Sequence, residues 1–239
     1  MKIVIIHLGN ITDLIPVSSV IKNIKKKYDG INITLISEYN ELYKYNKLID
    51  RNLSFDEFKE NNEYYDLLIN LYPYFPEYQC KEITVKKAIG FNYDDGLKQF
   101  EDIFFEGKRK YDMNIFQLYY ELVGLKWRGE GYDIGYYPRS KTRKNRIGIS
   151  VANANLRNYI MEKLELKDKK IWYISYKKNV FKKLDEINRC EKIITDDLLI
   201  FHLAMNLRKY VYFLETFPIN LKLELFNNGE IHKVSLANL

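Results

Sequence analysis

Short apolar runs alternate with segments of helical period along this chain, and no other feature of the sequence constrains the fold as strongly. Residues 2–8 are apolar at most positions, which is typical of a strand buried on both faces of a parallel sheet. In residues 13–28 the apolar side chains recur with the period of a helix. Strands that alternate with helices in this way predict a parallel, doubly wound sheet.

The alternation continues through two series of elements, separated by a polar, basic stretch at 139–146 that is interpreted as a linker. The sequence therefore predicts two α/β domains, residues 1–142 and 143–239, with a ligand-binding cleft between them. Further strands are predicted at 31–36, 65–71, 147–151, 171–175, 192–195 and 210–214, and helices at 41–48, 115–123, 159–164, 180–187 and 198–207.

The composition is that of a globular protein, with 46% apolar and 29% charged residues in a chain of 239. The net charge of +6 fits a protein that meets anionic ligands or an anionic membrane surface, although a solvated face explains it equally simply. The basic residues form two local clusters, at 22–27 and at 139–146. No nucleic-acid-binding motif accompanies them, so no nucleic-acid partner is predicted.

The two cysteines, Cys80 and Cys190, are isolated and lack the spacing of metal ligands, so we expect reduced thiols and no metal site. The N-terminus does not have the pattern of a signal peptide, and no apolar run approaches the roughly 20 residues of a membrane span. We therefore expect a cytoplasmic protein, with peripheral contact to the inner membrane surface as a further option.

The segment between the first strand and the first helix carries the first candidate site, with Gly9, Asn10, Thr12 and Asp13. A single glycine is far from a dinucleotide fingerprint or a phosphate loop, so those kinds of nucleotide binding are not supported. The sequence leaves two interpretations of Asp13 open. It either stabilises the first helical turn by roughly 0.3–1 kcal/mol, with Thr12 as the N-cap, or takes a proton from a bound hydroxyl.

A second candidate site follows the strand at 192–195. Asp196 and Asp197 stand between this strand and the next helix, and His202 comes five residues after Asp197. Taken alone, the pattern is equally that of a capped helix with one partly buried histidine.

Together the two segments resemble the paired signatures of glycosyltransferase family 9, the bacterial heptosyltransferases. In that family a Gly-Asp turn after the first strand holds the proposed base, and a later strand ends in Asp-Ser-Gly, followed after two residues by His-x-Ala. Gly9 and Asp13 fall at the places of the first signature. The spacing of the second is kept by Asp197, His202 and Ala204.

The tripeptide Arg157-Asn158-Tyr159 resembles the family's Lys-x-Trp, whose basic side chain faces the donor. The resemblance implies a GT-B fold of two Rossmann-like domains, with the acceptor on the first and the donor on the second. It implies an inverting, metal-independent transfer without a cofactor, from a nucleotide-diphosphate sugar to a glycan or lipid-linked hydroxyl. The residues implied are Asp13 as catalytic base, Arg157, Asp197 and His202 as donor-binding groups, and Gly9, Asn10 and Thr12 as loop backbone.

Four positions depart from the family pattern. Thr12 stands for the glycine before the base, Leu198-Leu199 stands for Ser-Gly, and Glu215 stands for a glycine after the next strand. The C-terminal domain is also expected to be reduced by a βα unit. A diphosphate at a helix N-terminus needs close backbone approach and free N–H groups, which two leucines hinder. We therefore keep two hypotheses: a glycosyltransferase, and a non-catalytic relative that binds a glycan or a protein.

Overall fold

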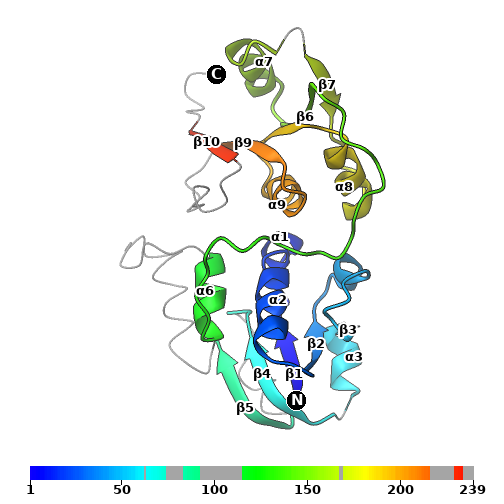
Figure 1. Ribbon diagram of the computed structural model, residues 1–239, viewed down its shortest axis with the longest axis vertical. Helices are drawn as coiled ribbons and strands as arrows, with labels where there is room; N and C mark the ends of the chain where they lie inside the picture. Colours follow the sequence, from blue (N-terminus) through cyan, green and yellow to red (C-terminus); the bar gives the residue numbers. More distant parts are fainter. Residues whose placement is uncertain (62, 74–82, 92–114, 167–168, 216–228, 234–239) are drawn as a thin grey trace. The chain divides into compact units, whose positions relative to one another are not determined.

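The computed structural model describes the chain except for residues 62, 74–82, 92–114, 167–168, 216–228 and 234–239. It divides into two compact units, Met1–Gly135 and Tyr136–Leu239. Each unit contains a five-stranded sheet, with helices packed beside it (Figure 1).

The sheet of the first unit has the strand order β3-β2-β1-β4-β5, and all of its strand pairs are parallel. β1 (Lys2–Ile6) lies at the centre, between β2 (Asn32–Ile36) and β4 (Tyr65–Asn70). The outer strands are β3 (Arg51–Leu53) and β5 (Val85–Gly90). Residues Ile3 to Ile6 of β1 are fully buried, as expected for a central strand covered on both faces.

The helix predicted at 13–28 is divided into α1 (Ile11–Leu14) and α2 (Val17–Lys27). The division falls at Pro16, which has no backbone N–H to continue the hydrogen-bond ladder. The helix predicted at 41–48 is instead the short 3-10 helix η1 (Asn40–Tyr43). Among its described residues, this unit also contains α3 (Phe55–Lys59), which begins with a capping box, and α6 (Ile115–Leu122), which is followed by Gly124 at φ +68°.

The sheet of the second unit has the order β10-β9-β8-β6-β7, again with parallel pairs throughout. Its strands are β6 (Arg146–Ser150), β7 (Lys170–Tyr173), β8 (Lys192–Thr195), β9 (Tyr210–Glu215) and β10 (Gly229–Lys233). Its helices are α7 (Ala154–Lys163), α8 (Val180–Asn188) and α9 (Leu198–Asn206). The predicted parallel α/β architecture is therefore confirmed for both units.

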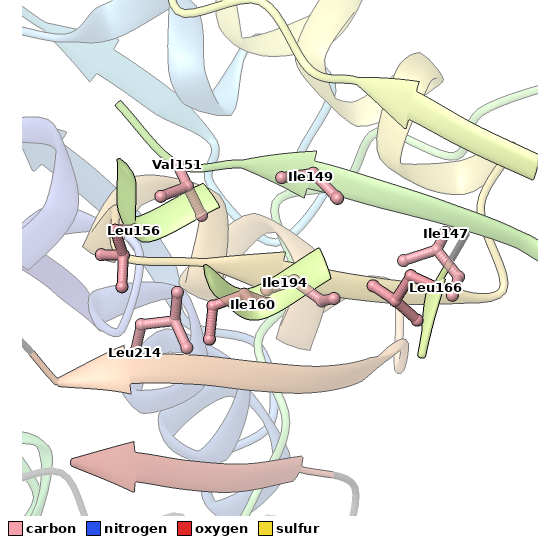
Figure 2. Packing of buried hydrophobic residues seen from close by; sticks show 8 residues of the cluster. All are labelled: Ile147, Ile149, Val151, Leu156, Ile160, Leu166, Ile194 and Leu214. Carbon is pink, nitrogen blue, oxygen red and sulfur yellow. The ribbon is translucent and has the colours of Figure 1, made fainter. Parts of the chain in front are cut away.

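The packing of α7 shows how the second sheet is covered. Leu156 and Ile160 of this helix point towards aliphatic side chains of β6, β8 and β9 (Figure 2). Burying an aliphatic side chain of this size contributes roughly 1.5–3 kcal/mol relative to leaving it exposed. The buried members of this cluster are Ile147, Ile149, Val151, Leu156, Ile160, Leu166, Ile194 and Leu214.

The basic stretch at 139–146 is tied to α8 through the polar side chains around it. The Tyr136 hydroxyl donates to a carboxylate oxygen of Asp185 at 3.0 Å, and the Thr142 hydroxyl donates to the Asn188 carbonyl oxygen at 3.0 Å. Both contacts lie within the second compact unit, which begins at Tyr136, and the domain boundary at 142 stays a prediction. The side chains of Arg139, Lys141, Arg143 and Lys144 remain exposed.

Within the described parts of the chain, no helix is both long and apolar enough to cross a membrane.

Gly90 provides a test of the first sheet. Its φ is +102°, and an added Cβ would lie 2.1 Å from the Asn70 backbone oxygen, which accepts from the Phe91 N–H at 3.0 Å. Because this oxygen is held by the end of the sheet, Gly90→Ala should lower the free energy of unfolding of the first unit by about 2–5 kcal/mol. Urea unfolding followed by Trp127 fluorescence, in a Trp172→Phe background, measures this unit alone.

The matched control is Gly131→Ala, because an added Cβ at Gly131 meets nothing within 4 Å. This variant should stay within about 0.5 kcal/mol of the parent. Equal stability of the two variants would contradict the described backbone at Gly90.

Candidate functional site

Asp13 lies in the first turn of α1, the first helix after the carboxyl end of β1. Asn10 is the N-cap of this helix: its Oδ1 accepts from the N–H groups of Thr12 at 2.8 Å and of Asp13 at 3.0 Å. The expectation that Thr12 is the cap was wrong, because the chain enters the helix at Asn10 with an extended backbone (ψ 165°), as an N-cap requires. Asn10 also donates through Nδ2 to Asp13 Oδ2 at 2.7 Å.

The environment of Asp13 makes its carboxylate more basic than an exposed one. The side chain is half-buried, and burial raises the pKa of Asp13, while the hydrogen bond from Asn10 works in the opposite direction. Because Asn10 satisfies the N–H groups at the start of the helix, the carboxylate of Asp13 is not needed as the cap. Its arrangement is suited to accepting a proton from a neighbouring hydroxyl.

His7, at the end of β1, is a polar residue that the sequence did not single out. Its ring is buried, and its Nε2 lies 3.0 Å from the Tyr119 hydroxyl of α6. Burial lowers the pKa of His7 to about 4, so the ring is neutral near pH 7. Gly9 passes directly over this ring, because an added Cβ would lie 2.9 Å from His7 Cε1. The sequence signal that could have identified His7 is its position directly after the apolar run of β1.

In the second unit, Asp197 is the N-cap of α9. Its Oδ1 accepts from the N–H groups of Leu199 at 2.7 Å and Ile200 at 3.2 Å. The preceding turn is fixed to β6, because the Thr195 hydroxyl donates to the Ser150 carbonyl at 2.9 Å and accepts from the Asp197 N–H at 3.0 Å. Leu198 and Leu199 are both half-exposed at the start of the helix.

The charges of Arg157, Asp196 and Asp197 all act on the hydroxyl of Tyr176, which follows β7. The pKa of Tyr176 is raised mainly by burial and also by the charges of Asp196 and Asp197, while Ser150 and Arg157 lower it. The Arg157 guanidinium lies over the Tyr173 ring, 5.4 Å from its centroid. Three residues that the sequence singled out thus act on one tyrosine, and the structure adds Tyr173 and Tyr176, which carried no motif.

His202 lies inside α9 and is only 2% exposed. Burial lowers its pKa to about 3, so the imidazole is neutral, and its ring makes an edge contact with Phe201 at 5.0 Å between centroids. A positively charged phosphate contact from His202 is therefore not available near neutral pH. Its role in donor binding remains a prediction, restricted to that of a neutral hydrogen-bonding group.

The two cysteines and Glu215 are the remaining positions that the sequence singled out. Cys190 is buried, and burial raises the pKa of its thiol to about 11, so it stays protonated at neutral pH. Cys80 and the side chain of Glu215 lie outside the described residues. Among the residues that the structure describes, no group of three or more histidines, cysteines or carboxylates could hold a metal ion.

Two parallel α/β units in tandem, each with polar groups after the carboxyl ends of its strands, make up the GT-B-like architecture that the sequence predicts. No protein-family model and no curated protein matches the sequence. Solved structures do match the fold over nearly the whole chain. Escherichia coli heptosyltransferase WaaC with ADP aligns with 97% of this chain and 92% of its own, at a TM-score of 0.64 and 9% identity.

Two further structures agree with this result. The family 9 glycosyltransferase from Veillonella parvula covers 89% of this chain and 80% of its own, with a TM-score of 0.61 and 14% identity. Escherichia coli ADP-heptose lipopolysaccharide heptosyltransferase II covers 99% and 91%, with a TM-score of 0.60 and 11% identity. The predicted resemblance to glycosyltransferase family 9 is therefore confirmed at the level of the fold.

Proposed function

We propose that this chain is a glycosyltransferase that moves a sugar from a nucleotide-diphosphate donor to a hydroxyl of a glycan or glycolipid. The observation that carries the proposal is Asp13, a half-buried carboxylate of raised pKa placed directly after β1 in a heptosyltransferase-like fold. One of the matching structures contains ADP and another contains ADP-2-deoxy-2-fluoro heptose, which supports a nucleotide-sugar donor.

In the proposed reaction the first unit holds the acceptor and the second unit holds the donor. Asp13 takes the proton of the acceptor hydroxyl, and the acceptor oxygen forms the new bond to the anomeric carbon. The bond between that carbon and the diphosphate oxygen breaks, and the electron pair leaves with the diphosphate. Arg157 offsets the charge on the departing diphosphate. This is a single displacement, which inverts the anomeric centre.

A specific observation favours the alternative, a non-catalytic module that binds a glycan or a protein. The N–H groups of Leu199 and Ile200 are already bonded to the Asp197 carboxylate, and two leucine side chains stand at the start of the same helix. A diphosphate at this place has to compete with a carboxylate for its hydrogen-bond donors. The two hypotheses therefore differ in how strongly the second unit binds a nucleotide.

Replacing Asp13 tests the enzyme. Asp13→Asn keeps the size of the side chain but removes the base, so transfer should fall about 100- to 10,000-fold. The free energy of unfolding should change by no more than roughly 1 kcal/mol. The assay is release of nucleoside diphosphate from a panel of nucleotide sugars in the presence of glycan acceptors.

The matched control is Asp56→Asn, since Asp56 is also an acidic residue in the first turn of a helix, but it is exposed and pairs only with Lys59 at 3.4 Å. This variant should keep full activity. If Asp13→Asn retains activity as well, Asp13 only stabilises the first turn of its helix and is not the base.

The start of α9 tests the donor site. The wild-type protein should bind ADP weakly, and the double variant Leu198→Ser/Leu199→Gly should bind it more tightly, because a hydroxyl is added and two bulky side chains are removed. Isothermal titration calorimetry measures both affinities, with Leu48→Ser, at a half-exposed leucine of the first unit, as the control. Tight binding by the wild type would show that the leucines do not obstruct the site, and no binding by either form would favour the non-catalytic module.

We also propose that exposed lysines of α2 draw the protein to an anionic membrane surface, where a lipid-linked acceptor would lie. Lys22, Lys26 and Lys27 are exposed, whereas Lys25 is paired with Asp50 at 2.7 Å. Each exposed lysine near such a surface adds about 1 kcal/mol at low salt. Co-sedimentation with vesicles containing phosphatidylserine should therefore decrease in a Lys22→Gln/Lys26→Gln/Lys27→Gln variant but not in Lys25→Gln, and indifference of the wild type to anionic lipid would end this proposal.

A further inference from the structure

Exposed lysines and arginines gather where the strands of the second sheet begin. β6, β7, β8 and β9 are parallel neighbours, so their amino ends lie at one edge of the sheet, opposite the edge that carries Tyr176 and Asp197. Each of these strands has an exposed cation at its first residue or shortly before it. This set, called the basic edge below, consists of Arg143 and Lys144 before β6, Lys169 and Lys170 at β7, Arg189 and Lys192 at β8, and Arg208 before β9.

Backbone contacts hold these segments together along the edge. The Arg143 N–H donates to the Arg189 carbonyl oxygen at 3.1 Å. In the strand ladder, Arg146 pairs with Lys170, and the next residue of β6 pairs with Lys192. Because neighbouring strands are about 4.8 Å apart, the starts of β7, β6 and β8 form a row of cations.

The described carboxylates near this edge do not pair with its cations. Glu191 is exposed there, and its Oε2 accepts from the Asn145 N–H at 2.7 Å. Glu162 and Glu165 are exposed at the end of α7. Among the residues that the structure describes, no cation of the basic edge forms an ion pair. Like charges on neighbouring strands repel one another, and a bound anionic surface would offset this repulsion.

Helix termini explain only part of this charge. α8 and α9 end just before Arg189 and Arg208, and the partial negative charge of a helix C-terminus favours cations at such places. Lys144 instead belongs to the stretch at 139–146, and Lys170 is the first residue of β7. No helix dipole accounts for these two lysines.

The aromatic rings at this edge favour a membrane over a single-stranded nucleic acid. Trp172 is half-buried, and the Arg146 guanidinium lies 4.8 Å from its ring centroid. Tyr210 is also half-buried, and Lys192 Nζ lies 5.4 Å from its ring centroid. Single strands are bound through exposed rings on which bases stack. An anionic lipid surface needs only several exposed cations on one side of the protein.

We propose that the basic edge of the second unit docks onto the anionic phospholipid surface of a membrane. Because this edge lies at the amino ends of the strands, docking leaves the segments after their carboxyl ends, with Tyr176 and Asp197, uncovered by the membrane. The basic edge is a different surface from the lysines of α2. The inference does not require sugar transfer, so it can hold or fail independently of the proposed function.

Vesicles of phosphatidylcholine with and without phosphatidylserine test the docking. At low salt the wild-type chain should co-sediment with the vesicles that contain phosphatidylserine. Lys144→Gln/Lys170→Gln should lower the partition coefficient about 20- to 30-fold, because each lysine near an anionic surface contributes about fivefold. High salt should remove this difference, since it screens the attraction.

Lys177→Gln/Lys182→Gln is the matched control. Both lysines are exposed and lie beyond the carboxyl end of β7, in the following turn and in the first turn of α8. The control removes the same charge from the opposite edge of the same sheet, and it should partition like the wild type. Equal partition coefficients for the two double variants would mean that only net charge matters, which would overturn the proposal.

Duplex DNA provides the competing ligand. Tighter binding of the wild type to duplex DNA than to the vesicles at the same salt, lost in Lys144→Gln/Lys170→Gln, would also overturn the proposal and assign the basic edge to nucleic acid. If this variant does not fold, as judged by circular dichroism, Lys169→Gln/Arg189→Gln removes two other cations of the same edge and decides the question.

Discussion

The rest of the structure depends on one constraint. In each sheet the strands are parallel, and a central strand is hydrogen-bonded to a neighbouring strand on both sides. β1 pairs with both β2 and β4, and in the second unit β6 pairs with both β7 and β8. Because the strands of one sheet run in the same direction, the segments that follow them emerge at the same edge. Asp13 and His7 follow β1, while Tyr176 and Asp197 follow β7 and β8. Within each unit, the direction of the strands thus collects the polar groups at one edge of the sheet.

Asp13 in the first unit and Asp197 in the second have different structural roles. In the first unit Asn10 satisfies the first N–H groups of α1, so Asp13 keeps a carboxylate that is not used as a cap. In the second unit Asp197 performs the capping itself with one oxygen. This difference favours Asp13 as the chemically active group and gives Asp197 a structural duty besides any contact with a donor.

The fold resembles that of heptosyltransferases although only 9–14% of the aligned residues are identical. A core of this kind requires apolar side chains of suitable volume rather than particular residues, so the architecture tolerates extensive substitution. A donor site is less tolerant, because a diphosphate requires open backbone N–H groups. Under the proposed function, the leucines at the start of α9 would affect donor binding more than folding.

The sequence by itself determined the parallel α/β architecture, because the apolar runs of β1, β4 and β8 and the helical period of α8 are local patterns. It also indicated the two turns that carry Asp13 and Asp197, since each directly follows a strand. Short elements such as β3 and α3 left no such pattern. Only the tertiary structure decided that Asn10 caps α1, that His7 meets Tyr119, and that the Arg157 guanidinium lies over the Tyr173 ring. These outcomes depend on backbone geometry and on contacts between residues far apart in the chain, which no local period of the sequence encodes.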